Sequence, residues 1–142
     1  MLFRSTGEEI TFEELGGART HTTQSGVVDL RFASELEAIG AAKRWLSCLP
    51  QNNLDSPPHT EMPEDSEDLE ILQTLDANKK KIAGLVPENS NQPYDIVKVI
   101  ECVVDPESFF EIKPDYARNI SIGFASLGGQ SVGIVEIGRA HV

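Results

Sequence analysis

An acidic stretch without a single basic side chain divides this sequence into two parts. No Lys or Arg occurs between Gln51 and Asn78, where carboxylates are frequent and Pro57, Pro58 and Pro63 interrupt the chain. Such a composition offers little apolar surface to offset the entropy lost on ordering, and like charges keep the chain extended. We therefore predict a solvated linker over residues 51–70, with a folded piece on each side. A cation-binding loop is the alternative, because carboxylates suit calcium or magnesium, but the D-x-D-x-D-G spacing is absent.

The charge of the whole chain limits its partners. The 142 residues include 12 Lys and Arg against 23 Asp and Glu, a net charge of -11. This balance disfavours binding to the nucleic-acid backbone or to an anionic membrane surface, since both are held through clustered basic side chains. No apolar run approaches the roughly 20 residues of a membrane-spanning helix. Cys48 and Cys102 alone make no disulfide framework, which favours a reducing compartment.

The part before the acidic stretch begins with a helix-start signal. Thr11 and Glu14 have the spacing of a capping box, in which the hydroxyl accepts from a helical amide and the carboxylate accepts from the Thr11 amide. Gly16 and Gly17 should end this short helix, because glycine adopts the left-handed conformation without a Cβ clash.

A second capping-box pattern, Ser34 with Glu37, predicts a longer helix that ends before Pro50. Trp45 on this helix is interpreted as a packing residue. The β-branched residues 26–30 favour an extended segment or an edge strand between the two helices. The apolar positions of the longer helix recur at helical spacing, at Leu36, Ile39, Leu46 and Leu49.

After the acidic stretch, Asp95 is a suitable N-cap for a helix over residues 96–104. The Asp105-Pro106 pair should end this helix, because proline cannot continue it. One apolar stripe is predicted along it, formed by Ile96, Val99, Ile100 and Val103.

A β-hairpin is the clearest local signal in the chain. Strands over residues 119–126 and 131–135 flank Leu127-Gly128-Gly129-Gln130, and a glycine pair suits the tight primed turns that match strand twist. One face of the first strand carries only small residues, at positions 121, 123 and 125, which predicts that another backbone packs closely there. The hairpin needs further strands along its edges, so we expect the chain to be an internal fragment of a longer protein.

Few residues carry a recognisable chemical motif. His21 and His59, like the two cysteines, lack metal-ligand spacing, so we predict no metal site and no catalytic side chain. The segment from Leu15 to His21 contains a glycine pair whose exposed amides could stabilise negative charge on an oxygen. A helix end followed by a turn is the interpretation that spacing alone favours.

Seven short segments, in order and at matching spacing, together resemble biotin-dependent acyl-CoA carboxyltransferases, the family of the propionyl-CoA carboxylase β subunit. The run F-F-E-I-K-P-D-Y-A-R-N-I is most similar to the propionyl-CoA branch of that family. The segments are Glu13 to His21, Ser25 to Val27, Leu85 to Pro87, Pro93 to Asp95, Phe110 to Ile120, Gly123 to Ala125 and Val132 to Val135.

The resemblance implies an α/β fold with two crotonase-like domains, each a β-β-α superhelix, of which this chain would hold adjoining, incomplete pieces. Residues 1–50 would end the N-terminal carboxyltransferase domain, residues 51–92 would be the acidic interdomain linker, and residues 93–135 would start the C-terminal domain. Asp76–Gly84 looks inserted in the linker, either as a genuine loop or as retained intron sequence. Residues 136–142 look like translated sequencing-adapter sequence, an artefactual tail.

The function implied by the resemblance is transfer of a carboxyl group from carboxybiotin to the α-carbon of an acyl-CoA, here propionyl-CoA giving methylmalonyl-CoA. A biotin-carrying, biotin carboxylase partner subunit would hold the biotin and use ATP, and β subunits would form a homo-oligomer. The family's glycine-rich motifs for the two sets of anion-stabilising amides lie outside these residues, so the fragment itself is expected to bind no cofactor and to be inactive. The implied location is the mitochondrial matrix in a eukaryote or the cytoplasm of a bacterium.

Two alternatives stay open: a biotin-dependent methylmalonyl-CoA decarboxylase subunit, and a non-catalytic acidic interaction module. A cooperative thermal melt of the isolated chain would favour the module. The resemblance places six residues near the domain face that meets the opposing subunit, and these are expected to support substrate binding: Gly16, Gly17, Ala18, His21, Ser25 and Gly26.

Overall fold

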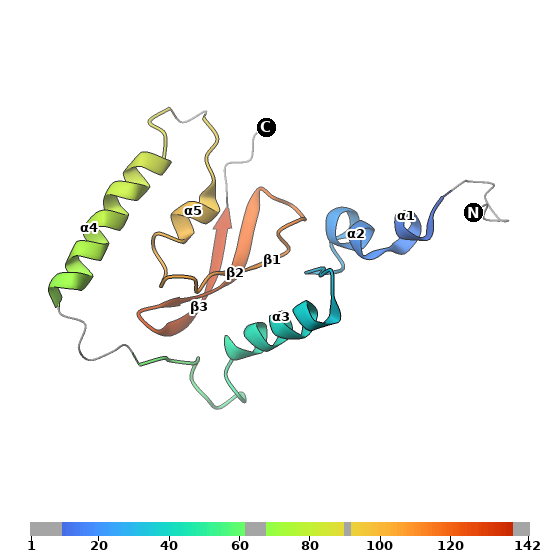
Figure 1. The fold of residues 1–142 in the computed structure, drawn as a ribbon, viewed down its shortest axis with the longest axis horizontal. Coiled ribbons are helices and arrows are strands. Elements are labelled where there is room, and N and C mark those ends of the chain that lie inside the picture. The colour runs from blue at the N-terminus through green and yellow to red at the C-terminus, as the bar shows by residue number, and fades with distance from the viewer. Residues whose placement is uncertain (1–9, 62–67, 90–91, 138–142) are drawn as a thin grey trace.

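A computed structural model describes residues 10–61, 68–89 and 92–137 of the chain (Figure 1). The acidic residues 62–67 and residues 138–142, both covered by predictions above, lie outside the described residues. The elements in chain order are α1 (Phe12–Gly16), α2 (Ala18–Thr20), the π-helix η1 (His21–Ser25), α3 (Glu35–Ser47), α4 (Asp68–Leu85), α5 (Ile96–Ile100), β1 (Phe110–Ile112), β2 (Ile120–Leu127) and β3 (Gln130–Ile137).

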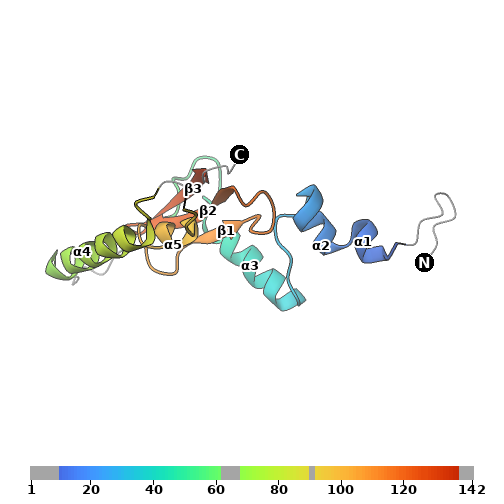
Figure 2. The same ribbon diagram turned by 90° about the horizontal axis from the view of Figure 1, so that it is seen from above.

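The centre of the molecule is an antiparallel sheet with strand order β1-β2-β3. In both views α4 lies at one end of the molecule and α1 at the other, with the sheet between them (Figures 1 and 2). Among the described residues, no helix is both long and apolar enough to cross a membrane.

The hairpin prediction is confirmed. β2 pairs with β3 from Ile120 opposite Ile137 to Leu127 opposite Gln130. Gly128 and Gly129 form the turn with φ of +59° and +78°, and positive φ at both positions is what the primed turn requires. β3 extends two residues beyond the predicted end, through Glu136 and Ile137.

A carboxylate holds the tip of this hairpin in place. Asp105 accepts hydrogen bonds from the Gly128 amide at 2.9 Å and from the Gly129 amide at 2.7 Å. Its own amide donates to the Ser126 carbonyl at 2.8 Å. Both amides of the glycine turn are therefore bound by a negative group from within the chain.

The small-residue face of β2 is the more buried of its two faces. Ser121 and Ala125 are 7% and 3% exposed. Ile100 and Val104 form the core with Ala125, and Phe109, Val132 and Ile134 pack against this cluster. A Cβ on Gly123 would run into the Phe110 carbonyl and the Phe109 ring, so only glycine allows strand β1 to approach this closely.

α3 lies beside β1, and most of the apolar positions that recur along it are exposed. Ser34 does cap the helix, accepting from the Glu37 amide at 3.3 Å, although the Glu37 carboxylate accepts from Ala33 instead of Ser34. The side chains of Leu36, Ile39 and Leu46 are 81%, 53% and 56% exposed. The side that faces β1, across an apolar pocket, is instead the one with Ala38, Ala41, Ala42 and Trp45.

α5 is shorter than predicted. Asp95 caps it as expected, accepting from the Val97 amide at 3.1 Å, but the helix ends at Ile100. Tighter turns follow, in which the Cys102 amide donates to Val99 and the Val103 amide to Ile100. The change of period turns Cys102 inward and leaves Val103 56% exposed, so the predicted stripe is wrong at Val103.

The stretch between the two parts contains more structure than the composition indicates. His59 forms an isolated bridge with Gln130, the Thr60 amide donates to the Gly129 carbonyl at 2.8 Å, and the Ser131 amide donates to Pro58 at 2.9 Å. α4 was not predicted, although its Leu, Ala, Gln and Lys residues all favour helices. Residues 26–30, predicted as an extended segment or edge strand, form no strand.

The hairpin turn offers a matched pair of substitutions. Gly128→Ala and Gly129→Ala should each lose about 1–2 kcal/mol of unfolding free energy from left-handed strain. A Cβ on Gly129 also collides with the Thr60 carbonyl, whereas a Cβ on Gly128 meets nothing within 4 Å. Gly129→Ala should therefore be clearly the more destabilising in urea unfolding followed by circular dichroism. Equal losses would mean that residues 58–60 do not dock on the turn.

Candidate functional site

The residues predicted to support substrate binding lie in the N-terminal block formed by α1, α2 and η1. The capping box that starts α1 is confirmed: the Glu14 amide donates to the Thr11 hydroxyl at 3.2 Å, and the Thr11 amide donates to Glu14 Oε2 at 2.9 Å. The Thr11 amide, followed by its hydroxyl, lowers the pKa of the Glu14 carboxyl below its ordinary value of 4.5. This block therefore starts at a charged and hydrogen-bonded cap.

The glycine pair ends α1, but not in the predicted conformation. Gly17 has φ of −75° and ψ of 168°, which is extended backbone and not left-handed. The Glu13 side chain folds over this turn and occupies the space that a Cβ on Gly17 would need. The Gly17 amide donates to the Glu13 carbonyl at 2.9 Å, and the Arg19 amide donates to Glu13 Oε1 at 3.0 Å. Both amides are therefore hydrogen-bonded within the chain, which agrees with the interpretation of this segment as a helix end followed by a turn.

His21, Ser25 and Gly26 form a corner at the end of η1. His21 Nδ1 lies 3.0 Å from Ser25 Oγ, and a Cβ on Gly16 would lie 3.6 Å from His21 Nε2. Gly26 ends the π-helix with a left-handed φ of +64°. The structure thus brings together Gly16, His21, Ser25 and Gly26, while Gly17 and Ala18 lie at the junction of α1 and α2.

This corner contacts the part of the chain that follows the acidic stretch. Lys113 Nζ donates to the Gly26 carbonyl and pairs with Asp29 Oδ1 at 2.8 Å, and the Lys113 amide donates to the Asp29 carbonyl at 3.2 Å. Arg31 Nε pairs with Asp115 Oδ2 at 3.1 Å. No local sequence signal predicts these contacts, because a pairing across more than 80 residues leaves no periodic pattern.

Arg44 makes a second connection between the two parts. Its Nη2 donates to the carbonyls of Glu107 at 2.8 Å and Phe109 at 3.1 Å, and its guanidinium lies 5.4 Å from the centre of the Phe110 ring. The same helix end carries Cys48, whose carbonyl accepts from Ser131 Oγ at 2.7 Å. Burial raises the pKa of the Cys48 thiol, against a smaller opposing effect of Arg44.

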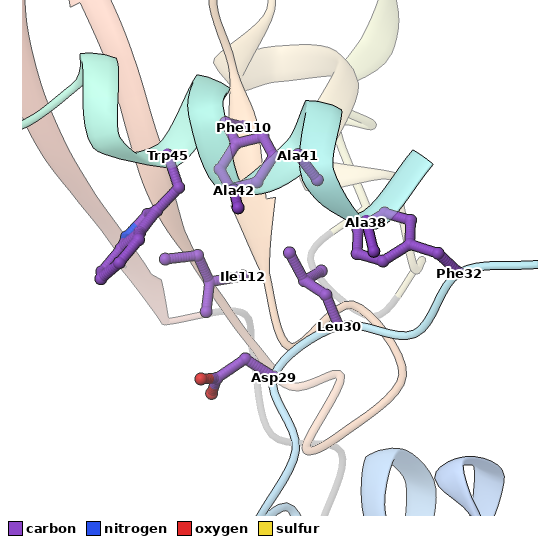
Figure 3. A pocket seen from close by; sticks show the side chains of 9 residues that line it. All are labelled: Asp29, Leu30, Phe32, Ala38, Ala41, Ala42, Trp45, Phe110 and Ile112. Carbon is purple, nitrogen blue, oxygen red and sulfur yellow. The ribbon is translucent and has the colours of Figure 1, made fainter. Parts of the chain in front are cut away.

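Two hollows flank these connections. An apolar pocket of about 270 Å³ lies between α3, the segment 29–32 and β1, with Trp45 and the α3 alanines facing Phe110 and Ile112 (Figure 3). A second pocket of about 380 Å³ carries charges of both signs: its lining includes Ala18, Glu13, Arg19, Arg31 and Asp115. Of the six residues predicted to support substrate binding, Ala18 is the one that lines this charged pocket.

The described part of the chain holds no group of three or more His, Cys, Asp or Glu side chains that could bind a metal ion. Both cysteines are free, Cys48 half-buried and Cys102 buried.

The chain as a whole matches a known protein family. The sequence model of the carboxyl transferase domain family matches residues 1–141, so the chain belongs to this family. The predicted resemblance to the propionyl-CoA carboxylase β subunit is confirmed at the level of that family.

Several propionyl-CoA carboxylase subunits are similar to this chain. The carboxyltransferase subunit of Haloferax mediterranei is 43% identical over 130 residues, which are 92% of this chain and 23% of that protein. The mitochondrial β chain of Sus scrofa is 42% identical over 130 residues and is covered to 22%. The acetyl-/propionyl-coenzyme A carboxylase beta5 subunit of Mycobacterium tuberculosis is 40% identical over 136 residues. The chain spans less than a quarter of the length of the first two relatives.

Solved structures agree with this assignment. Transcarboxylase 12S, with methylmalonyl-coenzyme A and methylmalonic acid bound, superimposes with a TM-score of 0.79 at 33% identity over 96% of this chain and 24% of its own. A single-chain, multi-domain long-chain acyl-CoA carboxylase shares the fold, with a TM-score of 0.67. The α/β class is thus confirmed by the helices and the small sheet, and the carboxyltransferase fold by these neighbours.

The capping box gives a pH-dependent prediction. Because the pKa of Glu14 is lowered in the folded chain, the stabilisation from its charge is present above the unfolded pKa and is lost as pH falls through the folded pKa. The Thr11 amide resonance should therefore titrate with a midpoint below 4.5, followed by NMR. Thr11→Val removes the hydroxyl but keeps the amide, which is the larger cause, so its midpoint should move only part of the way back. A wild-type midpoint above 4.5 would contradict the cap.

Proposed function

We propose that this chain is part of a carboxyltransferase subunit that transfers a carboxyl group from carboxybiotin to the α-carbon of propionyl-CoA, giving methylmalonyl-CoA. The observation that carries the proposal is the match of residues 1–141 to the carboxyl transferase domain, together with propionyl-CoA carboxylase relatives at 40–43% identity. Residues 1–50 and 93–135 would belong to two crotonase-like domains joined by the acidic segment.

The hydrogen bonds of this chain indicate which share of the chemistry it carries. Carboxyl transfer to an acyl-CoA places negative charge on oxygen, which needs free, preorganised amide donors. At the two glycine turns of this chain the Arg19 amide donates to Glu13, and the Gly128 and Gly129 amides donate to Asp105. These amides are engaged by carboxylates and do not fit an anion hole. We therefore place the anion-stabilising donors of the complete enzyme outside these turns.

Biotin, held by a partner subunit that also uses ATP, would supply the carboxyl group. This chain's own contribution would be to support the substrate pocket through the corner at the end of η1. The corner has the properties of a support: a left-handed glycine, a His21–Ser25 hydrogen bond and contacts to Lys113 from the other part of the chain. The residues proposed for this role are Gly16, His21, Ser25 and Gly26 at the corner, and Gly17 and Ala18 at the junction of α1 and α2.

A second direction of reaction is favoured by one neighbour. The transcarboxylase 12S structure holds methylmalonyl-coenzyme A at 33% identity to this chain. A subunit that removes the carboxyl group of methylmalonyl-CoA and passes it to biotin is therefore the second candidate. Either enzyme would be a homo-oligomer of this subunit with a biotin-carrying partner, in the mitochondrial matrix of a eukaryote or the cytoplasm of a prokaryote.

An assay of the complete subunit tests the proposal. Supplied with its biotin-bearing partner, ATP, radiolabelled bicarbonate and propionyl-CoA, it should form acid-stable labelled methylmalonyl-CoA. Omission of ATP is the control, because carboxylation of biotin requires it. Loss of carboxyl from methylmalonyl-CoA without ATP, and no carboxylation with it, would establish the second candidate. The absence of any acyl-CoA turnover would exclude both.

A further inference from the structure

The ring of Tyr116 packs directly on the backbone of Gly26. A Cβ built on Gly26 would lie 2.6 Å from Tyr116 Cε1 and 2.8 Å from both Cδ1 and Cζ. No real Cβ tolerates such distances, so the ring fills the space that a side chain at position 26 would take. Gly26 also has a left-handed φ of +64°. Two independent constraints, one steric and one conformational, thus require glycine at the corner.

The loop that presents Tyr116 is strained on both sides of it. Lys113 and Ala117 have φ of +57° and +48°, a region that residues with a Cβ adopt rarely and at a cost of about 1–3 kcal/mol each. The Tyr116 amide donates to the Lys113 carbonyl at 3.1 Å, and the Ile120 amide donates to Ala117 at 2.9 Å. Such strain persists only where the surroundings fix the conformation. The strained loop holds Tyr116 against Gly26 in the other part of the chain.

The position of Gly26 in turn fixes the polar pair beside it. Ser25 Oγ contacts His21 Nδ1 at 3.0 Å, and the Val28 amide donates to the His21 carbonyl at 3.3 Å. The bond from Val28 closes the loop that contains Gly26, and the His21–Ser25 contact lies directly before Gly26 in the chain. Lys113 Nζ adds a hydrogen bond to the Gly26 carbonyl from the same loop as Tyr116. A shift of Gly26 would therefore change the geometry of His21 and Ser25.

We propose that Tyr116 is a positioning residue, whose ring holds the Gly26 corner and thereby sets the His21–Ser25 pair for acyl-CoA binding. The identity of the ligand, an acyl-CoA, rests on the proposed function. The contact between Tyr116 and Gly26 rests on the structure alone. It assigns to a residue after the acidic stretch a role in the corner formed by residues before it.

The contact is tested first by stability, which needs no activity. In the complete subunit, Gly26→Ala and Tyr116→Ala should each lower the melting temperature, whereas the double variant should lose less than the sum, because removing the ring relieves the collision. Gly128→Ala is the matched control: it has a similar φ of +59° but no neighbour within 4 Å, so its effect should add to that of Tyr116→Ala. Additivity for Gly26→Ala as well would overturn the contact.

The positioning role is tested second, by kinetics. Tyr116→Ala should raise the KM for propionyl-CoA about tenfold while kcat changes less than about twofold, because ground-state and transition-state binding are lost together. Tyr116→Phe keeps the ring and should restore the wild-type KM. Tyr116→Leu provides a folded variant without a flat ring should the alanine variant not fold. An unchanged KM in folded alanine or leucine variants would overturn the role. A wild-type enzyme without turnover would instead refute the proposed function and leave the stability result to decide the contact.

Discussion

The arrangement of this chain depends on the contacts that Lys113 makes across the acidic stretch. Lys113 holds the segment from Gly26 to Asp29 against the loop before β2. Its amide and its ammonium group both bind Asp29, and its backbone is left-handed. The Asp29 side chain is 61% exposed, so the ion pair itself is worth at most about 1 kcal/mol. The geometry is therefore set by the whole group of contacts, including the Tyr116 ring on Gly26 and the Arg31–Asp115 pair, and not by charge attraction alone.

The sheet shows how small side chains decide which elements can approach each other. Gly123 allows β1 to approach β2 within the sheet, and Ala125 packs with Ile100 and Val104 on one face. On the other face, the alanines of α3 face Phe110 and Ile112 across a pocket. The larger apolar side chains of α3 then lie on its exposed side. A helix with leucines outward and alanines inward is unusual for a water-exposed surface, and it is consistent with a chain that spans less than a quarter of its relatives.

Hydrogen bonds within the chain explain the two glycine turns. Glycine pairs attract attention because free amides stabilise anions, yet here Glu13 and Asp105 occupy the amides at these turns. The turns act as internal joints, one between α1 and α2 and the other at the tip of the hairpin. The residues of the η1 corner, where backbone conformation and packing from a distant loop meet, are proposed to support substrate binding.

The sequence by itself determined the features that arise from neighbours along the chain. The caps at Thr11, Ser34 and Asp95 were predictable because a side chain and the amide it binds lie within three residues of each other. The Gly128-Gly129 turn was predictable because glycine itself adopts the positive φ that the turn needs. Only the tertiary structure decided which face of α3 packs, where α5 ends, and that Tyr116 meets Gly26. These depend on the volumes and directions of side chains brought together from distant positions, and no periodicity or spacing in one segment carries that information.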